Sequence, residues 1–149
     1  FNDGERTMSI YEYDFSKFLR EELNMDYNKD YYRNVMYKTF ADIEQKIDCD
    51  YVLAIDDKLL YIEIAGVIYN TKYDDWKEVK YKTKRENDYK ENMIFKENLL
   101  NENDKPFLFL FPYDMLSGEY KIKVNQFIND NIKICLFLYS LDSIIFRKV

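Results

Sequence analysis

Histidine is absent from this chain of 149 residues. Its absence excludes every mechanism that needs an imidazole, including Ser-His-Asp triads, Cys-His pairs, H-E-x-x-H zinc sites and histidine-ligated metal nucleases. The chain also has only 2 cysteines, too few for a disulfide framework or a zinc knuckle, so we expect two buried thiols. Any chemistry must therefore use carboxylates, lysine, arginine, tyrosine and water.

Long apolar runs are missing as well. No run reaches the roughly 18 to 20 residues that a membrane span requires, and the start does not resemble a signal peptide. The sequence thus predicts a soluble, cytoplasmic protein without a membrane partner. Residues 1–149 have the length of a single domain, and 47% hydrophobic residues are enough for a globular core. Because the first residue is Phe1 and not Met, we expect a piece of a longer protein with other domains.

The hydrophobic pattern predicts an α/β fold in which a mixed central β-sheet is flanked by helices. Residues 9–23 have apolar side chains at helical spacing, and Ser9 with Glu12 has the form of a capping box. Residues 51–55 and 59–65 are apolar runs separated by the turn-like "DDK", which indicates a hairpin of two central strands.

The remaining elements are predicted from weaker patterns. Residues 70–103 are strongly charged with apolar residues at intervals, which indicates a helix broken near Thr83. Pro106 and Pro112 delimit a buried strand in "KPFLFLFPYDM". We also expect an irregular strand over 35–40, a short helix over 124–132, and one or two final strands over 133–146.

Two carboxylates occupy unusual positions in the predicted hairpin. Tyr61, Glu63 and Ala65 share one face of the second strand, so Glu63 lies within an apolar strand and needs a partner. Counting outward from the turn places Asp50 roughly opposite Glu63. Carboxylates on adjacent strands can hold Mg²⁺, or Mn²⁺ as a substitute, and the carbonyl of Ile64 can add a ligand.

An Asp at the head of one strand, a hairpin, and a Glu within an apolar second strand resemble the PD-(D/E)XK nuclease superfamily. The usual signature has Lys two residues after the Glu, where this chain has Ala65. "EIAG" followed by "DYKENMIFKENLLNENDKPFLFLFPYDM" is similar to Vsr-like and phage homing-nuclease branches, with Tyr89 and Lys96 on the next helix. The resemblance implies a restriction-endonuclease-like core and an endonuclease of a phage or mobile element.

By this resemblance, Asp50 and Glu63 bind the metal, Lys96 orients or deprotonates the attacking water, and Glu12 supports the site. The implied reaction is Mg²⁺-dependent hydrolysis of phosphodiester bonds in nucleic acid, with DNA as the expected substrate. Other lysines compete with Lys96 for the catalytic role: Lys82, Lys84 and Lys90.

The most basic stretch of the chain is "KEVKYKTKRENDYK", residues 77–90. The net charge of −6 argues against broad coating of nucleic acid, but a local basic face can follow a phosphate backbone. Trp76 and Tyr81 can stack on the bases of a single strand. The predicted nucleic-acid contacts are Lys80, Lys82, Lys84, Arg85, Tyr89 and Lys90.

Each of these residues also has an ordinary structural interpretation. Asp50 can be a turn residue, Glu63 can lie on the solvent face of an edge strand, and Glu12 can be only a cap. Lys96 and the basic stretch can form a solvated helix face. The alternative function is a catalytically degenerate nuclease-fold module that binds nucleic acid or a protein partner, and a third is a pure protein-interaction domain.

Overall fold

Four strands form one mixed sheet in the order β1-β2-β3-β4. β1 with β2 and β2 with β3 are antiparallel pairs, whereas β4 pairs with β3 in parallel. The structure is a computed structural model that describes residues 1–68 and 75–132. Its strand order and pairing confirm the predicted α/β class with a mixed sheet. The strand bounds are Tyr31–Met36 for β1, Asp48–Ile55 for β2, Lys58–Ile64 for β3 and Phe107–Leu110 for β4.

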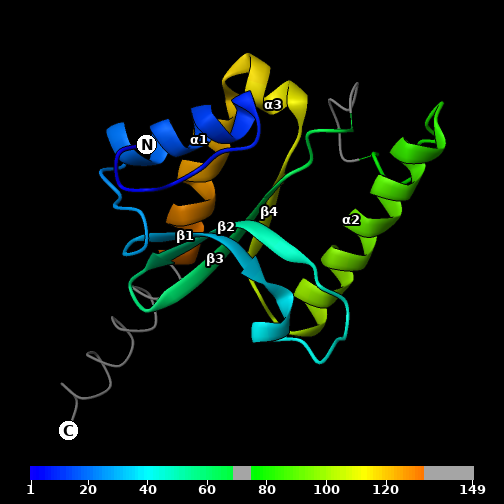
Figure 1. Ribbon diagram of the computed structural model, residues 1–149, viewed down its shortest axis with the longest axis horizontal. Coiled ribbons are helices and arrows are strands. Elements are labelled where there is room, and N and C mark those ends of the chain that lie inside the picture. Colours follow the sequence, from blue (N-terminus) through cyan, green and yellow to red (C-terminus); the bar gives the residue numbers. More distant parts are fainter. Residues whose placement is uncertain (69–74, 133–149) are drawn as a thin grey trace, which may run out of the picture.

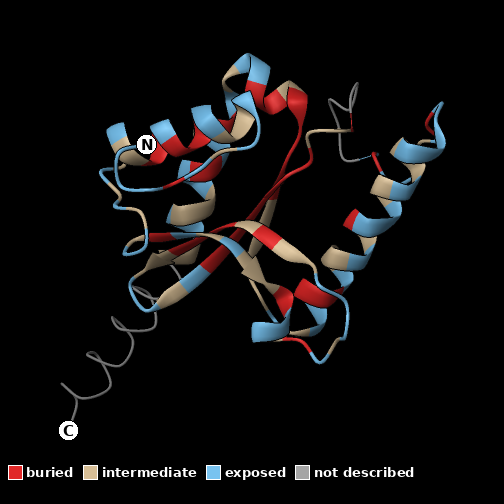
Figure 2. Cartoon of the chain, viewed as in Figure 1, coloured by how far each residue is buried: buried red, intermediate tan, exposed pale blue. Residues whose placement is uncertain are grey.

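Helices cover both faces of this sheet (Figure 1). Helix α2 (Lys84–Glu102) lies on one side, and α1 (Ile10–Glu21) lies on the other with helical residues 119–132. Because strand side chains alternate between the faces, each face has its own apolar core, and buried residues concentrate along the central strands (Figure 2). The result is a three-layer arrangement with the sheet in the middle.

The hairpin of β2 and β3 is closed by a two-residue turn. Asp56 and Asp57 have φ angles of 49° and 63°, the left-handed conformation that both central residues of a type I′ turn require. Aspartate tolerates this conformation better than most residues do. The turn fixes the pairing of Ile55 with Lys58, and this register extends to Tyr51 opposite Ile62.

Two of the predicted elements have different bounds. The strand predicted over 35–40 is instead β1, which ends at Met36 and continues as a 3-10 turn over Tyr37–Thr39. The helix predicted within 70–103 begins only at Lys84, after the N-cap Thr83. Residues 75–83, which precede it, are not helical, and Trp76 among them is buried in the core.

The chain after β4 also departs from the prediction. The strand lies between Pro106 and Pro112 as expected, and helix α3 (Pro112–Ser117), for which the sequence analysis predicted no element, follows it. Asp114 favours this helix because its Oδ2 accepts the backbone N–H of Phe111 at 2.9 Å. The helix predicted over 124–132 begins earlier, at 119, and the strands predicted over 133–146 lie outside the described residues.

The structure describes one of the two predicted thiols. Cys49 is a buried free cysteine, and Cys135 lies outside the described residues. None of the helices in residues 1–68 and 75–132 combines the length and apolarity needed to cross a membrane.

Candidate active site

Asp50 and Glu63 lie side by side on β2 and β3. Continuing the register of Tyr51 with Ile62 by one residue places the two carboxylates on facing positions. Asp50 Oδ2 accepts the backbone N–H of Ile64 at 2.7 Å, which fixes its side chain at the end of β3. Burial raises the pKa of Asp50, although that N–H and the charge of Lys96 oppose the shift.

Glu63 is buried, with only 2% of its surface exposed, because β3 lies between β2 and β4. The solvent-face interpretation of this residue is therefore wrong. Its Oε1 accepts the Tyr37 hydroxyl at 2.9 Å and lies 3.0 Å from Lys96 Nζ. Burial and the neighbouring charge of Asp50 raise the pKa of Glu63 to about 8, while Lys96 and Tyr37 act in the opposite direction.

Lys96 reaches this pair of carboxylates from α2, the helix that covers the face of the sheet opposite to α1. Its Nζ also donates to the Asp48 carbonyl at 2.8 Å, and its side chain is 17% exposed. Burial disfavours the ammonium, but the charges of Glu63 and Asp50 outweigh it and raise the pKa of Lys96. The side chain is thus a buried, charged partner of the carboxylates and not part of a fully solvated helix face.

Glu12 lies on the other side of Asp50, at the start of α1. Its own N–H donates to Ser9 Oγ at 3.2 Å, so Ser9 is the N-cap as predicted. Its Oε2 accepts the N–H of Met8 at 2.6 Å and not that of Ser9, so the predicted capping box is incomplete. Its charge also contributes to the raised pKa of Asp50. Glu12 therefore both holds the backbone at the start of the helix and adds negative potential at the pair.

Arg33 joins these elements and was missed by the sequence analysis. Its Nη2 lies 3.2 Å from Glu12 Oε2, and its Nε donates to the Asp50 carbonyl at 3.0 Å. The guanidinium also lies 4.1 Å above the ring of Tyr51. Alternation along β1 was the available signal, since Arg33 shares a face there with the buried Tyr31.

Glu5 holds the N-terminal segment against the same region and was also missed. It is 2% exposed and accepts hydrogen bonds from Ser16 Oγ at 2.5 Å and from the Tyr31 hydroxyl at 2.5 Å. Burial opposes ionisation, but these donors and Arg20 lower the pKa of Glu5 below its usual value. Nothing in the local pattern of residues 1–8 distinguishes this carboxylate from an exposed one.

Two tyrosine hydroxyls border the carboxylate pair. Tyr37, from the 3-10 turn, donates to Glu63, and Tyr89, from α2, donates to the Ile64 carbonyl at 3.4 Å. Burial and the nearby carboxylates raise the pKa of both phenols, so both remain neutral donors at neutral pH. Tyr89 was predicted to contact nucleic acid, and the structure places it beside the predicted metal ligand.

The donor set fits a magnesium ion of the kind that keeps several waters. Mg²⁺ is usually bound by one or two carboxylates, with water and substrate phosphate oxygens completing the octahedron. Asp50 and Glu63 supply two carboxylates whose mutual repulsion a cation would relieve, and the Ile64 carbonyl is adjacent. Within the described part of the chain, no group of three or more Cys, Asp or Glu side chains is arranged to hold a metal.

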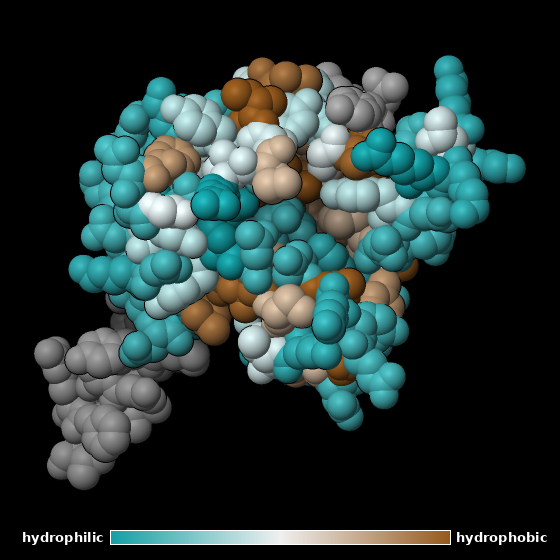
Figure 3. Space-filling view, viewed as in Figure 1, coloured by the Kyte–Doolittle hydropathy of each residue, from teal (hydrophilic) through white to brown (hydrophobic). Residues whose placement is uncertain are grey.

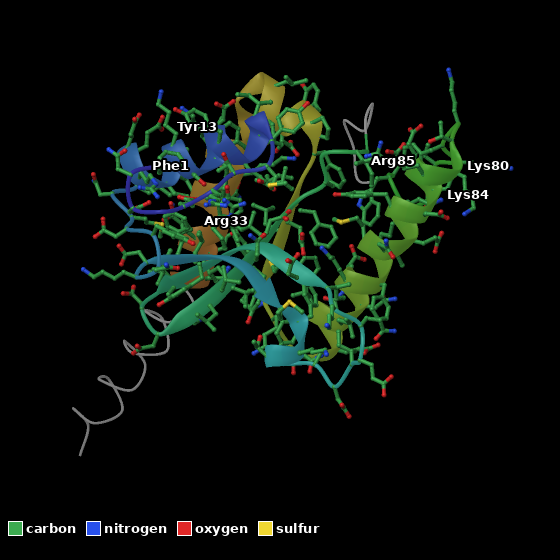
Figure 4. All side chains as sticks on the ribbon, viewed as in Figure 1. Phe1, Tyr13, Arg33, Lys80, Lys84 and Arg85 are labelled. Carbon is green, nitrogen blue, oxygen red and sulfur yellow. The ribbon has the colours of Figure 1, made fainter. Side chains whose placement is uncertain are left out.

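The predicted basic contacts divide into two groups. Figure 4 shows Lys80, Lys84 and Arg85 together at the N-terminal end of α2, well away from Arg33. These three and Lys82 are exposed. In contrast, Lys90 is half-buried and donates to the Val79 carbonyl at 3.0 Å, which holds its ammonium beside the backbone that precedes α2.

Trp76 and Tyr81, predicted to stack on bases, belong to the core instead. Trp76 is 4% exposed and packs against Phe109 and Phe111. Tyr81 is 9% exposed and donates to the Trp76 carbonyl at 3.1 Å. Neither ring face is available to a nucleic-acid base.

The structure brings together Asp50, Glu63 and Lys96, and the charge of Glu12 acts on Asp50. The exposed basic residues Lys80, Lys84 and Arg85 lie at the N-terminal end of α2 instead. Comparison with known protein families, curated proteins and solved structures finds no match for this chain.

Proposed function

We propose that the chain is a Mg²⁺-dependent endonuclease domain of the PD-(D/E)XK type that hydrolyses phosphodiester bonds, with DNA as its substrate. One observation carries this proposal: Lys96 from α2 lies 3.0 Å from Glu63, on the face where Asp50 and Glu63 are paired. Ala65 occupies the position at which the PD-(D/E)XK signature has its lysine. Lys96, on helix α2, would supply the missing ammonium beside Glu63. The order of one helix, three antiparallel strands, a helix and a parallel strand also supports a restriction-endonuclease-like core.

In this proposal one set of residues holds the ion, and Lys96 orients the attacking water. Asp50, Glu63 and the Ile64 carbonyl would hold Mg²⁺, which supplies Lewis-acid polarisation of the phosphodiester and a more acidic bound water. Lys96 favours the ionised form of Glu63 against the effect of burial, and it has three N–H donors, of which Glu63 and Asp48 occupy two. The third can donate to the attacking water or to a phosphate oxygen.

Tyr37 and Arg33 act on the geometry of the pair and not on the substrate. The hydroxyl of Tyr37 fixes Glu63 Oε1, and Arg33 fixes the backbone of Asp50 through its carbonyl. Catalytic groups must be held within fractions of an ångström of productive geometry. We assign both residues a positioning role.

A second candidate is a catalytically degenerate module that binds nucleic acid or a protein partner. The ion pair of Lys96 with Glu63 favours it, because an ammonium can neutralise a buried carboxylate without any metal. Under this alternative, Lys96 and the two carboxylates are only a structural cluster.

Titration with Mn²⁺, followed by calorimetry, separates the two candidates. The nuclease proposal predicts one site that is lost in Glu63→Gln and retained in Glu91→Gln, which removes an exposed carboxylate from the same protein. Equal Mn²⁺ binding by wild type and Glu63→Gln, or no binding by either, would favour the module.

A further inference from the structure

A groove follows α2 from its N-terminal end toward Lys96. It consists of two adjoining hollows with volumes of about 450 and 230 Å³. Tyr89 and Asn92 line both hollows, so the two are connected along one side of the helix. The first hollow is bordered by Lys84 and Arg85, and the second by Phe95, Lys96 and, across from the helix, Lys46.

We propose that this groove binds a single nucleic-acid strand and directs it toward Asp50 and Glu63. The direction of the strand rests on the proposed nuclease function, whereas the binding itself can be measured without any cleavage. Lys46, Asn92 and Phe95 are new to this assignment, since the basic stretch that the sequence singled out ends at Lys90.

The charge of the lining favours a polyanion. Four cationic side chains face two acidic ones, Asp48 and Asp88, although the whole chain has 28 acidic and 22 basic residues. Lys46 and Arg85 are exposed and make no ion pair with any residue in 1–68 and 75–132. Figure 3 shows hydrophilic side chains over α2, which carries acidic as well as basic residues, so the excess of cations belongs to the groove and not to the whole helix. Phosphate binding would neutralise cations that the protein itself leaves unpaired.

The spacing of the lining residues matches an extended ligand. Arg85, Tyr89, Asn92 and Lys96 follow one another at intervals of four, three and four, so they form one stripe on α2. At about 1.5 Å per residue the stripe is about 16 Å long. A strand that advances about 3.4 Å per nucleotide would place about five nucleotides along it.

Phe95 distinguishes a single strand from a duplex. Phe95 is 37% exposed and lines the second hollow together with Lys46 and Lys96. An exposed ring beside cations can stack on an unpaired base, and such stacking tolerates any sequence. Duplex bases are already stacked on one another and do not offer this contact.

Binding can be tested with metal-free protein in EDTA. A fluorescein-labelled oligothymidylate of about 12 nucleotides and a blunt duplex of equal length serve as anisotropy probes. We expect the single strand to bind more tightly than the duplex, and Phe95→Ala to weaken single-strand binding about five- to 100-fold. Leu59→Ala is the matched control, because Leu59 is 47% exposed at the far end of β3 and should have no effect.

Charge reversal gives an independent test. Lys46→Glu should weaken binding and reduce the salt dependence by about one phosphate contact, whereas Lys29→Glu, an equal change at an exposed site outside the groove, should not. Equal affinity for duplex and single strand, or unchanged binding in Phe95→Ala and Lys46→Glu, would overturn the groove assignment. If the groove assignment fails but the protein still shows metal-dependent cleavage, the proposed nuclease function is retained. If the single strand binds tightly but is not cleaved, the nuclease function is wrong and the groove assignment is retained.

Discussion

The buried carboxylate of Glu63 should make the metal-free protein less stable as the pH rises from about 5 to about 8. Its pKa rises from 4.5 in the unfolded chain to about 8 in the folded protein. Between these values the folded state binds more protons than the unfolded state, so the free energy of unfolding must fall with increasing pH. At about 1.4 kcal/mol per pH unit, the loss over this window is about 4 kcal/mol.

Glu63→Gln removes the titrating group and keeps an amide oxygen that can accept from Tyr37. The variant should therefore lack this part of the pH dependence, and its stability relative to wild type should increase by about 4 kcal/mol between about pH 5 and about pH 8. Urea unfolding in EDTA measures the difference, with the fluorescence of Trp76, the one tryptophan of the chain and a buried residue, as the probe.

Glu91→Gln is the control for this prediction, because Glu91 is exposed on α2. It should follow the wild-type profile. If wild type and Glu63→Gln show parallel profiles, Glu63 does not titrate between about pH 5 and pH 8, and its assignment as a repelled, buried carboxylate is wrong. Saturating Mg²⁺ should restore stability at about pH 8 in the wild type and in Glu91→Gln but not in Glu63→Gln, because an ion that binds only the folded state stabilises it.

The remaining predictions concern the groups around this carboxylate. Lys96→Met should reduce Mg²⁺-dependent cleavage by at least about 100-fold in a single-turnover assay, because it removes the ammonium proposed to orient water. Tyr37→Phe should destabilise the protein by about 1 to 3 kcal/mol in urea unfolding, because it removes a hydrogen bond to a buried carboxylate. Glu5→Ala should lower stability by about 3 to 5 kcal/mol, because it removes a buried carboxylate that pairs with Arg33 and Arg20 and accepts the hydroxyls of Ser16 and Tyr31; unchanged thermal unfolding would contradict this.

The hairpin and the facing carboxylates could be predicted because their signals are local. The turn residues Asp56 and Asp57 fix the register, and period-two alternation places Glu63 on the same face as Tyr61. Lys96 was predicted from a resemblance alone, and several lysines on the same stretch have equivalent sequence surroundings. Only tertiary packing shows which of them reaches Glu63.

Other features depend on contacts distant in sequence, which no local pattern records. Glu5 is buried by Ser16, Tyr31 and Arg20, and none of these contacts follows from residues 1–8. Trp76 lies in a charged segment that was predicted to be helical. Its ring instead packs against Phe109 of β4 and against Phe111. Burial of one aromatic side chain outweighs the helix propensity of its neighbours.

The most direct test of the proposed function is cleavage of end-labelled DNA, single-stranded and duplex, in Mg²⁺ and in EDTA. The proposal predicts cleavage in Mg²⁺ that EDTA abolishes, that Asp50→Asn and Glu63→Gln both lose, and that Glu91→Gln retains. Cleavage that persists in EDTA or in Glu63→Gln would contradict a metal-dependent nuclease at the Asp50 and Glu63 pair. The same holds if the protein cleaves no DNA under any condition and binds no Mn²⁺.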